Sequence, residues 1–262
     1  MIKQLLNRFH NSIQSELKFI CLIPEVAKTM PITPASKVNY NWFRSATESF
    51  KQQKELAPTN AAIRHIARCP GIISVSKNGW IQRSYQDISI NTNGDGTSFE
   101  WSTPLDQSKM ATEHEWNYNY VSHHDDKILA RYQELKPNTL RTVIKIQSPW
   151  VVYVPSGYQL LCLPIPYPDD SRFTAAIGII DGDQGPNFLN VQMFWHSLNS
   201  QELIPAGTPL AQYFLVKKEE IKITVDQFSK KTLEDLRLRR MTLESQFLPS
   251  YAKLKTTFLN KD

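Results

Sequence analysis

The side chains best suited to chemistry in this 262-residue sequence fall in three polar turns of its C-terminal half. The first turn, at Ser156 and Gly157, carries a hydroxyl group. The second, Gly178 to Asp183, carries two carboxyl groups at the end of an apolar run, and the third, at Gly207, leads to the amide of Gln212. A hydroxyl, a carboxylate and an amide are donors and acceptors that can bind a polar ligand.

A second group of possible ligands is the run His123-His124-Asp125-Asp126, with His196 further along the chain. His123, Asp125 and His196 have the residue types of a non-haem iron site with two histidines and one carboxylate. Such a site needs the His-x-Asp sequence at the end of a barrel strand, and the residues just before His123 can supply that strand. A solvated polar loop is the alternative interpretation of the same residues.

The composition is that of a globular protein, with 41% hydrophobic and 21% charged residues and a net charge of +5. This charge permits an anionic partner without requiring one. Aromatic side chains at 116–120 and 193–195, with basic residues in 227–246, could contact single-stranded nucleic acid. Packing in a sheet core or a subunit contact is the alternative for the aromatic residues.

The sequence also gives expectations about location. The three cysteines, Cys21, Cys69 and Cys162, are far apart and odd in number, which favours a reducing compartment. The N-terminal residues lack the continuous apolar stretch of a secretory signal, and no apolar run approaches a membrane span of about 18 residues. We expect a protein that is neither secreted nor in a membrane.

The elements that position these residues are expected to be strands for the most part. Residues 71–103 read as a β-meander with turns at 77–79 and 93–96, where Asn and Gly cluster. Short apolar runs separated by Pro, Gly and Asn then predict strands at 142–147, 150–154, 159–164, 174–180, 189–195, 201–204, 210–216 and 221–225.

Helical spacing of apolar residues is found mainly near the two ends of the chain. It predicts helices at 1–18, 40–56, 61–68, 126–135 and 227–246, the last with Ser229 as its N-cap, and residues 19–23 read as a strand. We divide the chain into an N-terminal helical and irregular segment, 1–70, a β domain, 71–225, and a C-terminal helix with its tail, 226–262. The fold class is mainly β, a distorted barrel or jelly-roll-like sandwich with peripheral helices.

The three turns together resemble the core of the dUTPase and dCTP-deaminase superfamily, also called β-clip proteins. Ser156-Gly157 matches a Ser-Gly turn, Gly178-Ile179-Ile180-Asp181 matches a strand ending in Gly-x-Ile-Asp, and Gly207 with Ala211-Gln212 matches a Gly-x-x-x-Ala-Gln segment. The resemblance covers residues 142–218. It implies a distorted β-barrel, assembly as a homotrimer and sites at subunit boundaries.

The resemblance also implies roles for these residues. Ser156 and Gly157 would hold phosphate oxygens, Asp181 would act as the general base on a water molecule, and Gln212 would donate a hydrogen bond to a phosphate. A Mg²⁺ ion would bridge the phosphates. On this hypothesis the protein is a Mg²⁺-dependent nucleotide-binding protein or pyrophosphatase.

Other residues depart from that enzyme pattern. Pro155 stands where a basic residue is usual, Gln184 replaces the stacking aromatic residue, and a basic helix replaces the Gly-rich closing arm. The Pro-Ser-Gly-Tyr and Ile-Pro-Ala-Gly-Thr-Pro segments, with Cys69-Pro70, also resemble an uncharacterised family of tailed-phage proteins. We therefore expect a phage assembly or virion module, located in the virion or the host cytoplasm, that self-associates and contacts other virion proteins, without catalysis and without a cofactor. A nucleotide pyrophosphatase and a metal-dependent barrel enzyme are the alternatives.

Overall fold

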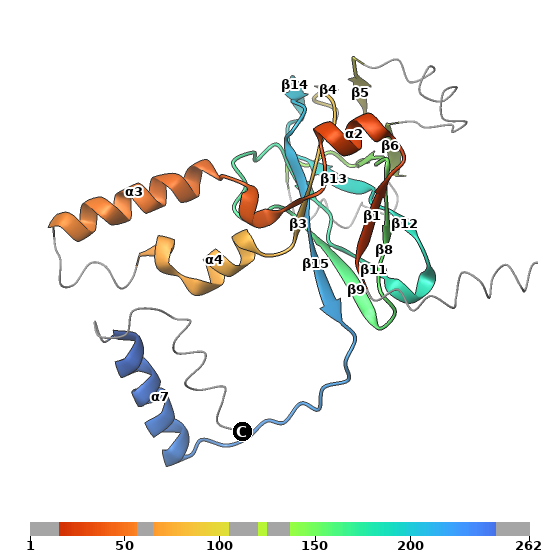
Figure 1. Cartoon of the computed structure of the whole chain (residues 1–262). Coiled ribbons are helices and arrows are strands. Elements are labelled where there is room, and N and C mark those ends of the chain that lie inside the picture. Colours follow the sequence, from red (N-terminus) through yellow and green to blue (C-terminus); the bar gives the residue numbers. More distant parts are fainter. Residues whose placement is uncertain (1–15, 57–64, 105–119, 125–136, 245–262) are drawn as a thin grey trace, which may run out of the picture. The chain divides into compact units, whose positions relative to one another are not determined.

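The computed structural model of the chain describes residues 16–56, 65–104, 120–124 and 137–244 (Figure 1). The chain divides into two compact units. The sheet unit comprises Met1–Trp42 and Ser76–Lys218 and contains all the strands of the described residues. The helical unit comprises Phe43–Val75 and Glu219–Asp262.

The strands of the sheet unit pair antiparallel throughout the described residues and form four sheets. The largest has the order β11 (Gly178–Asp181), β9 (Tyr158–Leu163), β15 (Pro209–Lys217), β3 (Trp80–Arg83) and β2 (Thr33–Pro34). The second has the order β10 (Phe173–Ala175), β13 (Val191–Trp195), β7 (Val143–Ile146) and β6 (Val121–His124). The two three-stranded sheets have the orders β1 (Lys18–Cys21), β8 (Trp150–Tyr153), β12 (Asn187–Phe188) and β14 (Asn199–Ile204), β4 (Ile88–Asn93), β5 (Phe99–Ser102).

Helices are few among the described residues. Those of the sheet unit are α2 (Pro24–Thr29) and the short 3₁₀ turns η1 (Ala35–Lys37) and η4 (Gly182–Gln184). The other described helices are α3 (Asn41–Leu56), η2 (Ile66–Arg68), α4 (Pro70–Lys77) and α7 (Lys230–Glu244). Ser229 caps α7 as predicted, because its hydroxyl accepts a hydrogen bond of 3.1 Å from the backbone N–H of Thr232.

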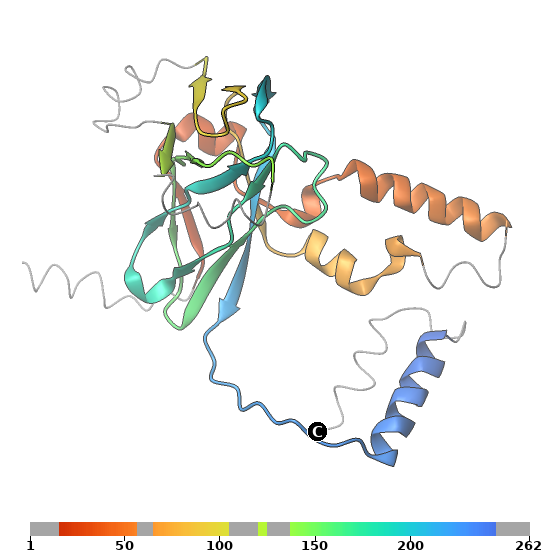
Figure 2. The ribbon, with the colours of Figure 1, turned by 180° about the vertical axis from the view of Figure 1, so that it is seen from behind.

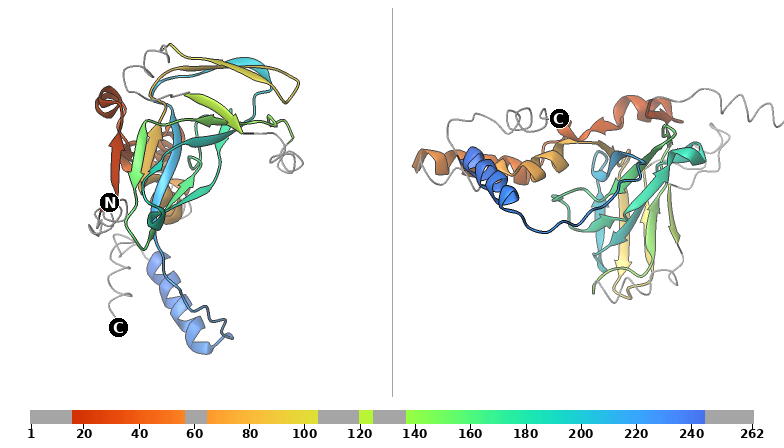
Figure 3. Two further views of the ribbon diagram at one scale, coloured as in Figure 1. Left: turned by 90° about the vertical axis from the view of Figure 1, so that its right-hand side faces the viewer. Right: turned by 90° about the horizontal axis from the view of Figure 1, so that it is seen from below.

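One hydrophobic core lies at the centre of the sheet unit, and side chains from all four sheets reach it. Its largest fully buried members include Trp195, Tyr120 and Tyr213. Alternation along each strand produces this core, since every second residue points to the same face of a sheet. Figure 2 shows the sheet unit from behind, and the side view in Figure 3 shows β9, β15 and β3 next to one another, in agreement with their pairing.

The expectation of a mainly β fold is therefore confirmed. Each of the four sheets is open, with an edge strand on both sides, so the described residues contain no closed barrel. In the β-rich region, most predicted strands between 142 and 216 are present, and the turn at 93–96 joins β4 to β5 as predicted. Helix α3 agrees with the prediction for 40–56, and α7 with that for 227–246. The predicted helices at 1–18 and 126–135 fall almost wholly outside the described residues, and of 61–68 only η2 is described.

The prediction of a β-meander that begins at residue 71 is wrong at its start, because residues 70–77 form the helix α4. Pro70 occupies the first helical position, where its fixed φ suits a helix and its missing N–H costs nothing. The predicted hairpin turn at 77–79 instead joins this helix to β3. Gly79 has φ +79°, and a Cβ there would lie 2.1 Å from the carbonyl oxygen of Tyr213, so its lack of a side chain allows β15 to approach.

Two further strand predictions need correction. The run 174–180 is two strands, since β10 pairs with β13 while β11 pairs with β9 in another sheet. Residues 221–225 form no strand in the described structure and belong to none of its sheets, although their alternation is that of a strand. Among the described helices, none combines the length and the apolar character that a membrane crossing requires.

Candidate functional site

The Ser-Gly turn and the acidic turn meet, as the sequence resemblance implied. The hydroxyl of Ser156 donates a hydrogen bond of 2.8 Å to Oδ1 of Asp183, and the N–H of Gly157 donates one of 3.3 Å to the same oxygen. Between the two acidic residues, Gly182 fits against the first turn: a Cβ there would lie 2.3 Å from the carbonyl oxygen of Pro155. The two turns therefore pack with no room for a side chain at that position.

Lys218 completes this group, and its contribution was not predicted from the sequence. Its ammonium group donates to Oδ1 of Asp181 at 2.5 Å and to Oδ2 of Asp183 at 2.6 Å. Its backbone N–H also donates to the carbonyl oxygen of Gly157 at 2.8 Å. We call Ser156, Asp181, Asp183 and Lys218 the polar clasp, because together they join the ends of β9, β11 and β15.

The charges of the polar clasp determine what it can do. Lys218 lowers the pKa of Asp181, and Lys218 followed by Ser156 lowers the pKa of Asp183 to about 2. The two carboxylates in turn raise the pKa of Lys218. A carboxylate with a lowered pKa is a weaker proton acceptor, since an effective general base has its pKa near the working pH. The carboxylate oxygens could hold Mg²⁺, but Lys218 occupies one oxygen of each group.

The structure does not bring Gln212 to the polar clasp. This side chain is fully buried, and its amide donates to the carbonyl oxygen of Asn78. Gln212 pairs with Leu163 while Lys217 pairs with Tyr158, so the two positions lie five residues apart, roughly 17 Å along an antiparallel strand. Gln212 fastens β15 to the residues before β3 and does not face a phosphate held at Ser156.

The proposed metal ligands are also separated. Both ring nitrogens of His196 bond to hydroxyl groups, Nδ1 to Thr139 at 2.9 Å and Nε2 to Thr174 at 2.8 Å. His123 lies on β6, two strands away from β13, and Asp125 lies outside the described residues. Within those residues, no group of three His, Cys, Asp or Glu side chains is arranged to hold a metal ion.

Two of the cysteines are not activated nucleophiles. Burial raises the pKa of Cys162 to about 11, and burial likewise raises the pKa of Cys21. A thiol with a raised pKa is almost entirely protonated at neutral pH, so it reacts slowly. Cys162 lies on β9 and packs against the hydrophobic core.

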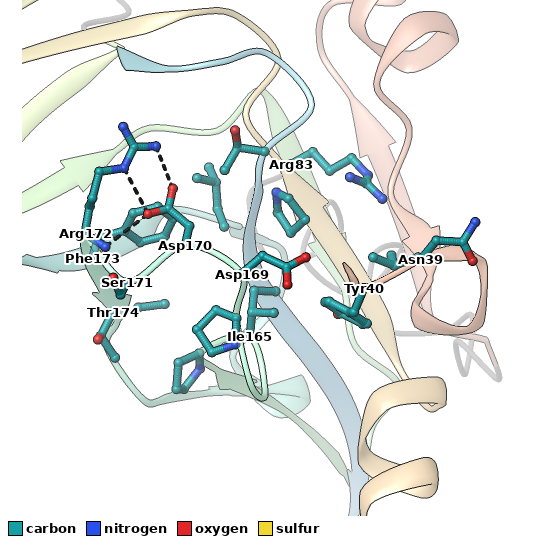
Figure 4. Close-up of a pocket in the computed structure, with 17 residues that line it drawn as sticks. Asn39, Tyr40, Arg83, Ile165, Asp169, Asp170, Ser171, Arg172, Phe173 and Thr174 are labelled. Carbon is teal, nitrogen blue, oxygen red and sulfur yellow. Dashed lines mark hydrogen bonds and ion pairs between the residues drawn. The ribbon is translucent and has the colours of Figure 1, made fainter. Parts of the chain in front are cut away.

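A pocket of about 760 Å³ lies elsewhere in the sheet unit, and sequence reasoning missed it. Figure 4 shows Asn39, Tyr40 and Arg83 on one side of it, Arg172, Phe173 and Thr174 on the other, and Asp169 between them. Its residues come from four separate parts of the sequence, namely 38–40, 83, 164–175 and 208–210. No single motif spans these segments, so a local pattern could not reveal the pocket.

The charged residues around this pocket differ in their pairing. Arg172 forms ion pairs with Asp170 at 2.7 Å and Glu202 at 3.1 Å, so its charge is balanced. Asp169 accepts hydrogen bonds from the N–H groups of Asn41 at 3.0 Å and Trp42 at 3.4 Å, at the first residues of α3. Arg83 donates to the carbonyl oxygen of Gly207 at 2.7 Å, and within the described part of the chain it forms no ion pair.

Comparisons with known proteins give no family for this chain: no protein-family model and no curated protein matches it. The class that can be stated is a mainly β protein with several antiparallel sheets and few helices.

Proposed function

We propose that this protein is a non-catalytic assembly module of a phage, which self-associates by adding a strand from one copy to a sheet of the next. It would act in the virion or in the host cytoplasm, contact other virion proteins and assemble as a homotrimer. We also infer that its four open sheets form a jelly-roll-like sandwich related to the distorted barrel of dUTPase-like proteins. The observation that carries the proposal is an exposed apolar edge strand together with an unpaired apolar segment.

The edge strand is β11. It is the last strand of its sheet, so one side of its backbone has no neighbouring strand among the described residues. Ile179 is 61% exposed, and Ile177, just before the strand, is 70% exposed. An edge that is both apolar and open invites pairing with a further strand, which proteins otherwise prevent with charge or cover.

The apolar surface continues across the sheet on the face turned away from the core. Ile179 lies opposite Leu161, and Leu161 lies opposite Phe214, so the three form one cross-strand row. The row beside it, Ile180, Leu160 and Leu215, belongs to the hydrophobic core. Neighbouring rows face opposite sides of a sheet, so the row of Ile179 belongs to the outer face.

The proposed occupant of this edge is the segment 221–225 of a second copy, which we call the arm. Ile221, Ile223 and Val225 alternate with polar residues, which is the pattern of a strand. These three side chains are 76%, 86% and 95% exposed, and the arm pairs with no strand in the described structure. Pairing with β11 would bury the apolar side chains of both partners and satisfy backbone groups on both.

Such an exchange joins two different surfaces, the arm of one copy and β11 of the next. A head-to-tail contact of this kind forms a ring when its rotation closes. The trimer of the resembled family is one such ring. The polar clasp supports a structural role, because Lys218 pairs with both carboxylates and holds the end of β11 in place.

The mass of the protein in solution, by light scattering on a sizing column, tests the proposal. We expect a trimer for the wild type, and a monomer for both Ile179→Lys and Ile223→Lys. Combining Ile179→Lys with Ile223→Glu should restore part of the self-association, because the two substitutions introduce opposite charges on the two segments that pair. Leu203→Lys on β14, which is 50% exposed in a different sheet, is the matched control. A monomeric wild type, or trimers for both single variants, would contradict the proposal.

The second candidate function is Mg²⁺-dependent nucleotide binding or pyrophosphate release. The observation in its favour is the meeting of Ser156 and Gly157 with the acidic turn of Asp181 and Asp183. Incubation with dUTP or dCTP and Mg²⁺ tests it. Pyrophosphate release by the wild type that is lost in Asp181→Asn would establish this function over the assembly module, and intact nucleotide in both samples would remove it.

A further inference from the structure

A different region of the sheet unit suggests a ligand site that is independent of self-association. The pocket of about 760 Å³ falls within the range of small-molecule sites, roughly 300–1,000 Å³. Its lining combines apolar residues, among them Ile165, Phe173, Pro209 and Leu210, with polar and charged residues on both sides. A concave site with apolar walls and polar groups that fix the orientation of a ligand can bind an organic molecule.

Two polar groups at one side of the pocket can donate to a ligand. Tyr40 is 6% exposed, and its hydroxyl has no hydrogen-bond partner among the described residues. Arg83 lies close enough to influence Tyr40 electrostatically and has no ion-pair partner in that same part of the chain. A buried hydroxyl without a partner is unfavourable, so a ligand oxygen that accepts a hydrogen bond from it is favoured.

The protonation of these groups fits the binding of an anion. Burial raises the pKa of Tyr40, so the hydroxyl remains a donor at neutral pH. Arg83 is a permanent cation, and the carbonyl oxygen of Gly207 orients its guanidinium group. Both groups therefore donate hydrogen bonds, and an oxygen acceptor with a negative charge is complementary to them.

The neighbouring charges favour an anion with a single charge. Arg172 pairs with two carboxylates, those of Asp170 and Glu202, so this group offers no unbalanced positive charge. Asp169 also lines the pocket and raises the pKa of Tyr40 by its negative charge. Asp169 repels any anion, and it repels a dianionic phosphate more strongly than a carboxylate with one charge, which matches the single guanidinium group of Arg83.

A series of aromatic rings leads to Tyr40, which lines the pocket. The rings of Tyr40 and Trp42 lie 6.4 Å apart between centroids, and those of Trp42 and Tyr167 lie 5.2 Å apart. Tyr167 is 50% exposed and has φ +51°, a conformation that is unusual for a residue with a side chain and costs energy. This series of rings runs from the surface to the residue beside the pocket.

We propose that this pocket binds an organic monocarboxylate with an apolar or aromatic body, held by Arg83 and by the hydroxyl of Tyr40. The carboxylate accepts hydrogen bonds from the guanidinium group of Arg83 and from the hydroxyl of Tyr40. The body of the ligand occupies the apolar part of the pocket. The carboxylate can belong to a free organic acid or to the C-terminus of a peptide, because both present the same group.

Matched pairs of probes test the charge requirement. Phenylacetate and phenylacetamide represent the free acid and its neutral counterpart, and N-acetyl-Leu-Phe with a free or an amidated C-terminus represents the peptide. Amide chemical shifts of isotope-labelled protein measure binding. We expect the acid of at least one pair to bind, at least about tenfold more tightly than its amide, since a hydrogen bond to a charged group contributes about 1.5–3 kcal/mol. Absence of binding by both acids, or equal binding of acid and amide, would overturn the proposal.

Two variants locate the site. Arg83→Gln should weaken acid binding about tenfold or more, and the amides should be unaffected. Tyr40→Phe removes only an unpaired hydroxyl, so it should leave the free protein as stable or more stable while it weakens acid binding. The control Arg141→Gln changes an exposed arginine outside the pocket. Unchanged acid binding by both pocket variants would contradict the assignment. Loss of self-association in Ile179→Lys should leave acid binding unchanged, so failure of one proposal does not decide the other.

Discussion

The ammonium group of Lys218 lies 2.5 Å from Oδ1 of Asp181, which joins the residue after β15 to the last residue of β11. These strands do not pair with each other, since β9 lies between them. The contact therefore crosses a whole strand at one end of the sheet. The acidic turn in isolation suggests a catalytic carboxylate. In the structure, its carboxylate pairs with Lys218 and helps to hold the edge strand β11 in place.

Replacement of Lys218 with methionine is expected to lower the melting temperature, because Asp181 and Asp183 then face each other without a cation. The difference from the wild type should shrink at high salt, since screening weakens interactions between partly exposed charges. Thermal unfolding followed by circular dichroism at low and high salt measures both effects. Lys37→Met, at an exposed lysine of η1, serves as the control. Equal melting temperatures for Lys218→Met and the wild type at low salt would show that the clasp adds no stability.

The clasp also predicts a dependence of stability on pH. The pKa of Asp183 falls from an ordinary value of 3.8 to about 2 on folding, and that of Asp181 falls as well. The folded state therefore binds fewer protons than the unfolded state, so this contribution is complete above about pH 4 and is lost as the pH falls towards about 2. In thermal melts across that range, the stability difference between the wild type and Asp183→Asn should decline with falling pH. A constant difference would contradict the assigned pKa.

Substitution of Gly182 by alanine is expected to destabilise the protein by about 1–3 kcal/mol, the usual cost of inserting atoms into a packed region. The added methyl group would meet the carbonyl oxygen of Pro155 at 2.3 Å and those of Tyr158 and Val154 at 2.9 Å. Denaturant unfolding measures the change. Gly71→Ala is the matched control, because nothing lies within 4 Å of a Cβ at that position. Equal stabilities for the two variants would show that the turns can separate without cost.

If His196 has a structural role, its replacement should destabilise the protein, and added metal ions should not stabilise it. Replacing it with alanine leaves the hydroxyl groups of Thr139 and Thr174 without this partner, so we expect a loss of about 1–3 kcal/mol. His123→Ala should have little effect, because that side chain is exposed. Addition of Zn²⁺ or Fe²⁺ should leave the melting temperature of the wild type unchanged. A metal-dependent rise that disappears in both histidine variants would instead support a shared metal site.

The polar clasp illustrates what could be predicted about the site. Ser156 and the acidic turn were expected to lie together, and they do. Each turn could be recognised because it interrupts a strand pattern, and the resemblance implied that both belong to one site. Asp183 and Lys218 were not assigned, although Lys218 directly follows a predicted strand. Its contacts depend on which strand lies at the edge of the sheet, and no local pattern contains that information.

The arm and Gln212 were assigned roles that the structure does not give them. Alternation in 221–225 predicted a strand, but a strand exists only when a partner supplies its hydrogen bonds, and none of the described residues does so. Gln212 carried the residue type of a phosphate ligand, yet its buried amide bonds to Asn78. Side-chain type alone does not decide between a ligand contact and an internal hydrogen bond.

The sequence by itself determined the mainly β character, the positions of most strands and turns, and the cap of α7 at Ser229, because these follow from periodicity and short-range hydrogen bonding. Only the tertiary structure decided which strands pair, where β11 ends its sheet, and that Tyr40 and Arg83 line one pocket with residues 164–175. Contacts between residues so far apart in the chain arise from the packing of the whole core, which is a collective property of the sheets and not of any segment.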